Sequence, residues 1–242
     1  MRSYATAQLI GDRSHQCDAT ATATHNGARA YVLLDGIGSS DEIRDWTRTA
    51  ARRVARSAAY HCDAETGLRV QYNRYAADPD RQGPWGFGPQ ACAVVAVASP
   101  RWLTVAWCGD ARAYLLVGGT VLRLTQDHNL RRVYPPNDIH GGGNRNIVTS
   151  CLGSDETDQQ VKDRYGHPAI ESVTRLSENS RLLLASDGAY EPLEDSCRNL
   201  ADYLIGTPTE AARDFTQSAI DHAGEYADNA TVLIADLGQA TP

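Results

Sequence analysis

Short apolar runs, rather than long ones, decide what this chain can fold into. Seven segments of four to eight residues are rich in aliphatic, β-branched or aromatic side chains, and they have the length and composition of β-strands. They are residues 31–34, 91–98, 103–107, 113–117, 121–124, 181–185 and 231–235. Because four of them follow one another between residues 91 and 124, the centre of the chain is predicted to be rich in strands.

An amphipathic helical pattern follows the first predicted strand. After Ser39, apolar residues recur at three- and four-residue spacing, and charged residues fill the other face. The apolar positions are Ile43, Trp46, Ala50, Val54 and Ala58. Ser39 and Glu42 stand in the relation of a capping box, in which each side chain satisfies a backbone N–H at the helix start. We therefore predict a helix that begins beside Ser39.

A second helical pattern lies near the C-terminal end of the sequence. Thr207 and Glu210 form another capping-box pair, and Pro208 occupies the first helical position. A short helix that ends at Gly206 is expected before it. Helices thus lie on both sides of a block of strands, which favours a layered α+β fold over strict alternation of strands and helices.

Length and composition favour one large domain. The chain has 242 residues, 42% of them apolar and 22% charged, and no repeat or Ser/Gly linker divides it. The loosest stretches are residues 78–88 and 129–155. No apolar run approaches the ~20 residues of a membrane-spanning helix, and the N-terminal segment lacks a signal-peptide core. We expect a cytoplasmic protein without a membrane partner.

Charge and cysteine content exclude other classes of function. The formal charge is −7, from 23 basic and 30 acidic residues, so nucleic acid is not an expected partner. Six cysteines are scattered without a CxxC pair. This spacing matches no common structural zinc pattern, and several cysteines lie in apolar runs. We expect reduced, mostly structural thiols.

Acidic residues stand where several of the apolar runs begin or end. They are Asp18 at the end of RSHQCD, Asp35 after YVLL, Asp187 after RLLLAS, and Asp228 before ATVLIAD. A turn is the simpler explanation for each one alone. If they converge, however, their mutual repulsion requires a cation, and oxygen donors suit Mg²⁺ or Mn²⁺. Two such ions about 3.5–4 Å apart can generate a hydroxide for in-line attack on phosphorus.

Ordered motifs extend this pattern over almost the whole chain, from Ala5 to Leu237. They are GDRSHQCD (11–18), DGIGS (35–39), VAWCGDARAYLL (105–116), LTQDHN (124–129), VTSCLG (148–153), LLLASDG (182–188) and DNATVLIAD (228–236). In this order they resemble the metal-dependent protein phosphatases, the type 2C serine/threonine phosphatases, and above all their compact bacterial members. The resemblance implies one domain over residues 5–237, followed by a short tail at 238–242.

The resemblance also implies an architecture and a set of ligands. The fold would be a four-layer α/β/β/α sandwich, in which helices flank a central antiparallel β-sandwich with two Mn²⁺ or Mg²⁺ ions at one end. Asp35 would bridge both ions and the Gly36 carbonyl would bind one. Asp187 and Asp228 would complete the other ion's shell, and Asp18 would act on nearby waters.

Two further residues receive roles from the same resemblance. Arg13 matches the phosphate-binding arginine of the family, and a planar guanidinium can bind two phosphate oxygens. The resemblance implies that Arg13 and Asp35 are both catalytic. Asp110 matches an aspartate that helps to hold a weaker third ion, although a hairpin turn explains it equally well. His128 is interpreted as a structural residue that bonds a loop.

The chain departs from the family pattern near these residues. Cys17 stands where many relatives have a glutamate, and Ile37 stands where some have a histidine proposed as an acid. The glycine pair after Asp35-Gly36 is broken, and residues 89–92 read PQAC in place of a Gly-Thr-Thr segment. These changes leave Arg13 and the metal-site aspartates in place.

Two functions therefore remain in view. The first is hydrolysis of phosphoserine and phosphothreonine in proteins, by hydroxide held between two metal ions, with a phosphoprotein as substrate and a Ser/Thr kinase or its targets as partners. The alternative is a catalytically weak or inactive phosphatase-like module that acts as a phosphopeptide-binding or regulatory protein. His140-Gly-Gly-Gly143 resembles a lipase oxyanion segment, but no GxSxG motif accompanies it. These glycines instead predict a mobile flap over residues 129–155, beside the site.

Overall fold

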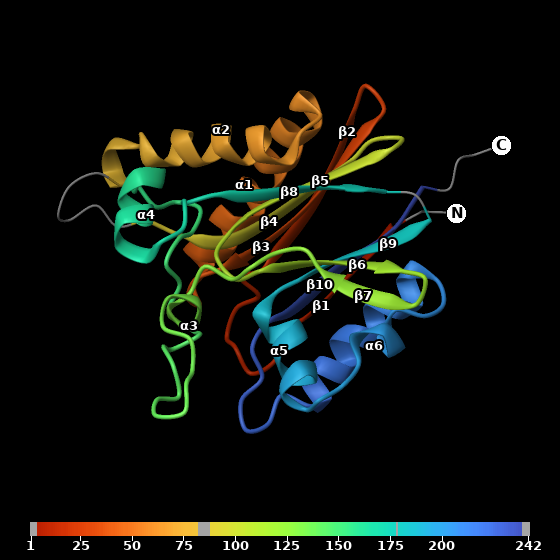
Figure 1. The fold of residues 1–242 in the computed structure, drawn as a ribbon. Coiled ribbons are helices and arrows are strands. Elements are labelled where there is room, and N and C mark those ends of the chain that lie inside the picture. Colours follow the sequence, from red (N-terminus) through yellow and green to blue (C-terminus); the bar gives the residue numbers. More distant parts are fainter. Residues whose placement is uncertain (1–3, 82–87, 178, 239–242) are drawn as a thin grey trace.

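Two antiparallel β-sheets packed face to face form the centre of the molecule (Figure 1). The computed structural model describes residues 4–81, 88–177 and 179–238. One sheet has the strand order β1-β10-β9-β6-β7 and the other has the order β2-β3-β4-β5-β8. The strands are β1 (Tyr4–Leu9), β2 (Ala19–His25), β3 (Ala28–Gly36), β4 (Ala91–Ala98), β5 (Trp102–Cys108), β6 (Arg112–Val117), β7 (Thr120–Arg123), β8 (Glu171–Leu176), β9 (Ser180–Ala185) and β10 (Ala230–Leu237).

Helices cover the outer face of each sheet, which gives four layers (Figure 1). Helices α1 and α2 pack on β2, β3 and β5, whereas α5 and α6 pack on β1 and β10. The helices are α1 (Asp41–His61), α2 (Ala64–Ala76), η1 (Pro79–Arg81), α3 (Leu130–Val133), α4 (Asp158–Tyr165), α5 (Asp187–Asp195), η2 (Leu200–Tyr203) and α6 (Pro208–Asp221). The predicted α+β sandwich of four layers, α/β/β/α, is confirmed.

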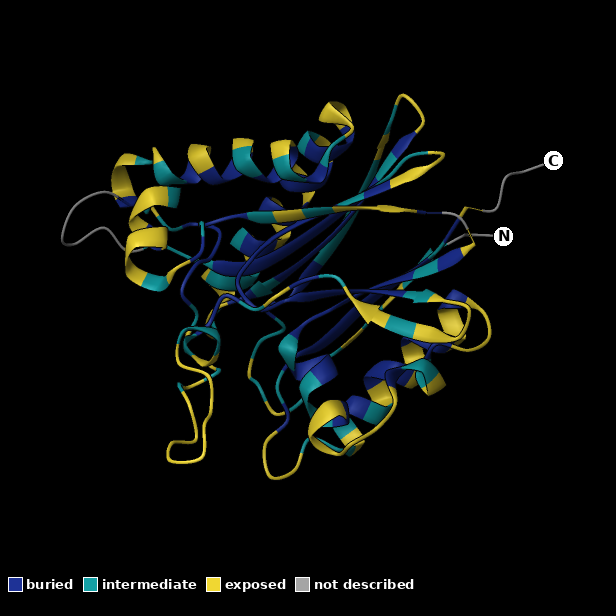
Figure 2. Ribbon diagram, in the orientation of Figure 1, coloured by how far each residue is buried: buried dark blue, intermediate teal, exposed yellow. Residues whose placement is uncertain are grey.

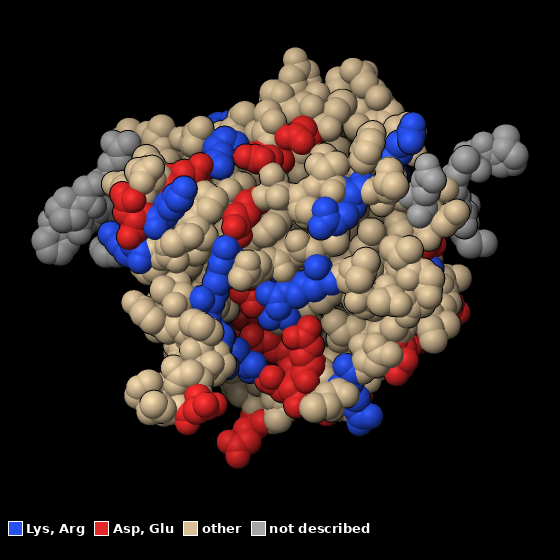
Figure 3. Space-filling view, viewed as in Figure 1, with Lys and Arg blue, Asp and Glu red and all other residues tan. Residues whose placement is uncertain are grey.

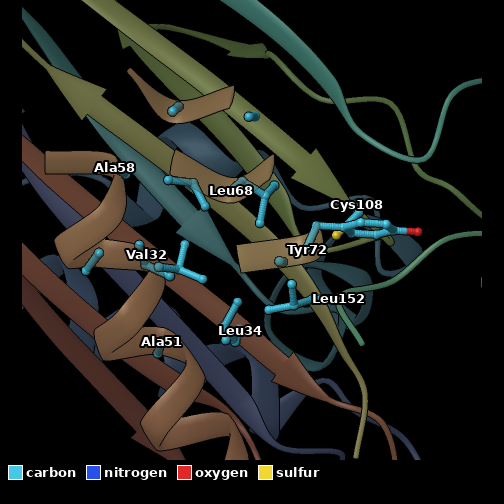
Figure 4. Close-up of a cluster of buried hydrophobic side chains, with 14 of the residues drawn as sticks. Val32, Leu34, Ala51, Ala58, Leu68, Tyr72, Cys108 and Leu152 are labelled. Atoms are coloured by element: carbon cyan, nitrogen blue, oxygen red, sulfur yellow. The ribbon is translucent and has the colours of Figure 1, made fainter. Parts of the chain in front are cut away.

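The central strands are buried on both faces, which explains their unbroken apolar sequences (Figure 2). In β3, Tyr31 and Leu33 point into the layer between the sheets, where they join Val94 and Leu233. The alternate residues of β3 point to the other face, where Val32 and Leu34 pack under α1 and α2 (Figure 4). These two packed layers fix the register of the sheets and therefore the positions of the strand ends.

The seven predicted strands are all present, and three more were not predicted from the sequence. The missed strands are β1, β2 and β8. Each lies at the edge of its sheet, and each alternates small or polar side chains with few large apolar ones, as in ATATATH. An edge strand buries less surface than a central one, so its sequence carries a weaker pattern.

Helix starts were predicted with mixed success. The box of Thr207 and Glu210 is formed at the start of α6. At α1, however, Ser40 rather than Ser39 is the N-cap, and its hydroxyl accepts a hydrogen bond from the Ile43 N–H at 3.2 Å. Ser39 does not cap the helix and contacts the Ser14 hydroxyl instead. The short helix predicted to end at Gly206 is the 3-10 turn η2, which ends at Tyr203.

Two boundary predictions concern the ends of the sequence. Residues 239–242 of the predicted tail lie outside the described residues, and the 5–237 domain limits stay a prediction.

Within the described part of the chain, no helix is both long and apolar enough to cross a membrane.

The close contact between α1 and α2 generates a prediction. A Cβ atom added at Gly67 would fall within 2.5 Å of the Ala58 backbone nitrogen. We expect Gly67→Ala to lower the free energy of unfolding by about 1–2 kcal/mol, because the overpacking cost exceeds the gain of about 1 kcal/mol in helix propensity. Urea unfolding measures the change. Gly141→Ala, where no atom lies within 4 Å, is the control, and equal effects of the two substitutions would contradict the prediction.

Candidate active site

The predicted site residues meet at one end of the β-sandwich. Asp35 and Gly36 end β3, Asp187 begins α5 directly after β9, and Asp228 lies in the loop before β10. Asp110 lies in the turn between β5 and β6. All five line one pocket of about 170 Å³, together with Arg13 from the loop between β1 and β2. Residues that are far apart in sequence are therefore neighbours at the strand ends.

Two glycines allow the loops around this pocket to approach one another. At Gly188, a Cβ atom would overlap the Asn229 carbonyl oxygen, so only glycine lets the start of α5 lie against the loop that carries Asp228. At Gly36, a Cβ atom would strike the Cys17 carbonyl oxygen. The Asp-Gly pairs of the sequence thus serve close packing as well as turns.

Arg13 and Asp228 bind each other across the mouth of the pocket. The Arg13 Nε donates to Asp228 Oδ1 and its Nη2 donates to Oδ2, both at 2.6 Å. Asp228 Oδ1 also accepts the backbone N–H of Asn229 at 2.7 Å. The residue predicted to hold phosphate is therefore paired with a residue predicted to hold a metal ion, a contact that the sequence did not indicate.

Asp18 lies deeper than the other carboxylates. It is buried, and its Oδ2 has no hydrogen-bond partner. Burial, and next the charge of Asp187, raise the pKa of Asp18 to about 8, although hydrogen bonds from Thr231 and Ser186 offset part of this. An ionised carboxylate here lacks a compensating charge.

The carboxylates that line the pocket likewise lack enough positive charge around them to compensate their ionised forms. Burial and the charge of Asp187 raise the pKa of Asp35 well above its usual range, and the same two causes raise that of Asp110 to about 7. The pKa of Asp187 is also raised, by burial and by Asp228. Bringing these groups together therefore costs free energy unless a cation joins them.

The donor set suits a hard divalent cation. Carboxylates and a backbone carbonyl are the ligands that Mg²⁺ and Mn²⁺ prefer, and the unpartnered Asp18 oxygen shows that an interaction is missing. As the side chains stand, however, no three His, Cys, Asp or Glu side chains of the described ranges are arranged around one ion position. In addition, Arg13 is paired with both Asp228 oxygens. The residues fit the metal chemically, but binding requires side-chain movement.

The residues that depart from the family pattern surround this pocket without filling it. The Cys17 thiol is buried and lies 3.7 Å from the Ser40 carbonyl oxygen, and burial raises its pKa. Ile37 is 40% exposed and lines the pocket mouth. Cys92 is paired with Asp35 in the sheet register and also lines the pocket.

The loop predicted as a flap is anchored at its base. His128 is fully buried, its Nε2 lies 2.9 Å from Glu171 Oε2, and its ring stacks on His167 at 4.1 Å. Burial lowers the pKa of His128 to about 4, so the ring is neutral near pH 7. Its backbone bonds Gly109 and Thr149. His128 thus has the loop-bonding environment predicted for it.

A second cavity beside the first contains residues that the sequence analysis missed. Arg145, from the loop 129–155, contacts Glu191 at 3.1 Å and Asp195 at 2.6 Å. This cavity of about 340 Å³ also includes Arg13 and Tyr226. Figure 3 shows acidic side chains gathered on this face beside α5, with basic side chains next to them. The spacing of Asp187, Glu191 and Asp195 at every fourth residue was the available signal.

The burial of Asp18 predicts a pH-dependent stability difference. The folded state holds the Asp18 proton more tightly than the unfolded chain does, so the protonated side chain adds to the free energy of unfolding at low pH. This stabilisation is lost as the pH rises from about 4 towards 8. In EDTA at pH 8, Asp18→Asn should therefore exceed wild type in free energy of unfolding by about 1 kcal/mol or more. The difference should shrink at pH 5. Denaturant unfolding at both pH values measures it, and a difference independent of pH would contradict the assignment.

Comparison with known proteins supports one family. The sequence pattern of the protein phosphatase 2C family matches residues 12–133, half of the chain. Probable protein phosphatase 2C 8 of Oryza sativa subsp. japonica is 28% identical over 86% of this chain and 51% of its own length. Probable protein phosphatase 1N of Mus musculus is 31% identical over 69% of this chain and 46% of its own length. The chain thus spans about half the length of these curated relatives.

Solved structures share the fold. PppA of Pseudomonas aeruginosa has a TM-score of 0.70 at 21% identity and covers 97% of both chains. The serine/threonine phosphatase PstP/Ppp of Mycobacterium tuberculosis has a TM-score of 0.65 at 22% identity with the same coverage. The catalytic domain of PstP has also been solved in complex with two manganese ions. These structures show the fold, and the family pattern that matches residues 12–133 shows that the chain belongs to the protein phosphatase 2C family.

Proposed function

We propose that this protein hydrolyses phosphoserine and phosphothreonine esters of proteins in a metal-dependent reaction. The observation that carries the proposal is the convergence of Asp35, Asp187, Asp228 and Arg13 in one pocket, from four separate segments of the chain. The manganese-bound structure of PstP supports a divalent cation. The pattern match covers Arg13 and Asp35, and Asp187 and Asp228 line the same pocket, which supports the proposal.

Each residue has a defined part in the proposal. Asp35, the Gly36 carbonyl, Asp187 and Asp228 would hold two Mn²⁺ or Mg²⁺ ions, Asp18 would act on waters at the edge of the cluster, and Asp110 would contribute to a weaker third site. When bound, the ions supply a hydroxide for in-line attack and offset charge on the phosphate. Arg13 binds phosphate oxygens with its planar guanidinium and holds the phosphorus in position.

Ile37 stands where some relatives have a histidine proposed as an acid, so no side chain at this position can protonate the leaving group. Its side chain is apolar and lines the pocket mouth. The serine or threonine oxygen must then take its proton from solvent within the site, which lowers the rate relative to a positioned acid. The alternative function, a phosphopeptide-binding module with little turnover, draws its support from this residue and from the pairing of Arg13 with Asp228.

Partner and location belong to the same proposal. The substrate is a phosphorylated protein, and a Ser/Thr kinase or its targets are the expected partners. A bacterial source and a cytoplasmic location are also proposed, and all six cysteines are free thiols, which supports a reducing compartment. Residues 5–237 form the proposed catalytic unit.

Loss of a pocket carboxylate tests the catalytic proposal. We expect wild type to release phosphate from p-nitrophenyl phosphate and from a phosphothreonine peptide with millimolar Mn²⁺, and to stop in EDTA. Asp35→Asn and Asp187→Asn should each lower kcat/KM by about 100-fold or more, the scale of losing a charge-stabilising group. Asp221→Asn, outside the pocket near the end of α6, should retain wild-type activity. If wild type releases no phosphate from either compound, the binding module becomes the better description.

Arg13 is expected to act mainly on substrate binding. At saturating Mn²⁺, Arg13→Ala should raise KM about tenfold with a smaller change in kcat, because it removes charge-assisted hydrogen bonds of about 1.5 kcal/mol from a partly exposed position. Steady-state kinetics on the phosphothreonine peptide measure both constants. An unchanged KM would place the phosphate elsewhere.

A further inference from the structure

Two residues that the proposed function assigns to different ligands are bound to each other. Asp228 is a proposed ligand of a divalent cation, and Arg13 is the proposed phosphate ligand. In the structure they form a two-pronged ion pair, with both nitrogen–oxygen distances at 2.6 Å. The Nε–Nη2 edge of Arg13 that would grip two phosphate oxygens is therefore already occupied.

Arg13 has a specific electrostatic place in the pocket. Among the described residues that line it, Arg13 is the one lysine or arginine, while Asp35, Asp110, Asp187 and Asp228 supply four carboxyl groups. The guanidinium thus partly fills the role of a counter-ion for the cluster. A divalent cation at Asp228 brings more charge to the same oxygens and competes with Arg13 for them.

The surroundings of Arg13 leave room for its side chain to move away from Asp228. Its side chain is 34% exposed. It lines the neighbouring cavity of about 340 Å³ as well as the carboxylate pocket. While Arg13 is paired with Asp228, the Tyr226 ring already lies 5.5 Å from the guanidinium carbon, and this cation–π contact does not depend on the pair. Release from Asp228 therefore moves the guanidinium within the site rather than into bulk water.

We propose that Arg13 is a latch on Asp228: it neutralises this carboxylate until a divalent cation takes its place, and only the released guanidinium binds phosphate. This inference rests on the proposed function for the identity of the two ligands. Its consequence is a coupling between two binding events. Cation binding raises the affinity for phosphate, and phosphate binding raises the affinity for the cation by the same factor.

The first test measures Mn²⁺ binding alone, by electron paramagnetic resonance of free Mn²⁺ in phosphate-free buffer. Arg13→Lys keeps the positive charge but loses the two-pronged pair, so it separates the latch from a general field effect. We expect Arg13→Lys and Arg13→Ala both to bind Mn²⁺ about three- to fivefold more tightly than wild type, as the loss of a partly exposed ion pair implies. Arg145→Lys is the control, because Arg145 pairs with Glu191 and Asp195 in the neighbouring cavity, and it should bind like wild type.

The outcomes of this titration are distinct. If Arg13→Ala tightens Mn²⁺ binding and Arg13→Lys matches wild type, only the charge matters and the latch is overturned. If neither variant changes the affinity, the two groups do not compete and the proposal also fails. If no form of the protein binds Mn²⁺, the latch and the proposed metal site fall together.

The second test measures release of the arginine without any metal. In EDTA, Asp228→Asn breaks the ion pair and frees Arg13, so it should bind radiolabelled inorganic phosphate about three- to fivefold more tightly than wild type in equilibrium dialysis. Asp187→Asn is the matched control, because it removes one carboxylate from the same pocket but leaves the pair with Arg13 intact. Equal gains in the two variants would refute the latch.

Neither measurement depends on catalysis. A protein that passes both tests but hydrolyses no phosphate ester keeps the latch and loses the proposed phosphatase activity. A protein that hydrolyses phosphothreonine but fails both tests keeps the activity and loses the latch.

Discussion

Desolvated negative charge is the constraint on which this structure depends. Asp18, Asp35 and Asp187 lie where β2, β3 and β9 begin or end, at one end of the sandwich. Burial weakens their hydration and strengthens their repulsion, which is why the pKa values of all three are raised. The repulsion between these carboxylates therefore destabilises the fold at a place where a bound cation would reduce it. The packing of the two sheets stabilises the fold enough to offset this repulsion.

The packing of the sheets produces this arrangement. Both faces of β3 are covered, one by the opposite sheet and one by α1 and α2, so a shift in register would expose large apolar side chains. The strand ends, and with them Asp35, are consequently fixed by contacts far from the pocket. Gly36 and Gly188 then allow neighbouring backbones to approach closely enough for the carboxylates to share one cavity. The contacts that pack the two sheets therefore also position the residues of the candidate site.

The sequence predicted those parts of the structure that depend on local pattern. Strands buried on two faces, such as residues 91–98, have continuous apolar sequences, whereas the edge strand at residues 19–25 alternates alanine and threonine and was missed. The family resemblance pointed to Asp35, Asp187 and Asp228 as site residues, and in the structure these three line one pocket. The contact between Arg13 and Asp228 joins residues 215 positions apart through side-chain rotamers. No spacing or periodicity encodes such a contact, because it depends on the finished tertiary structure.

The departures from the family pattern have unequal physical weight. Cys17 removes a carboxylate, but its thiol lies beside the Ser40 carbonyl and not in the pocket lining, so the four pocket carboxylates keep their places. Ile37, in contrast, replaces a potential acid at the pocket mouth itself. The first change lowers the negative charge that a cation has to balance, and the second removes a route for a proton. The departures thus bear more on leaving-group protonation than on cation binding.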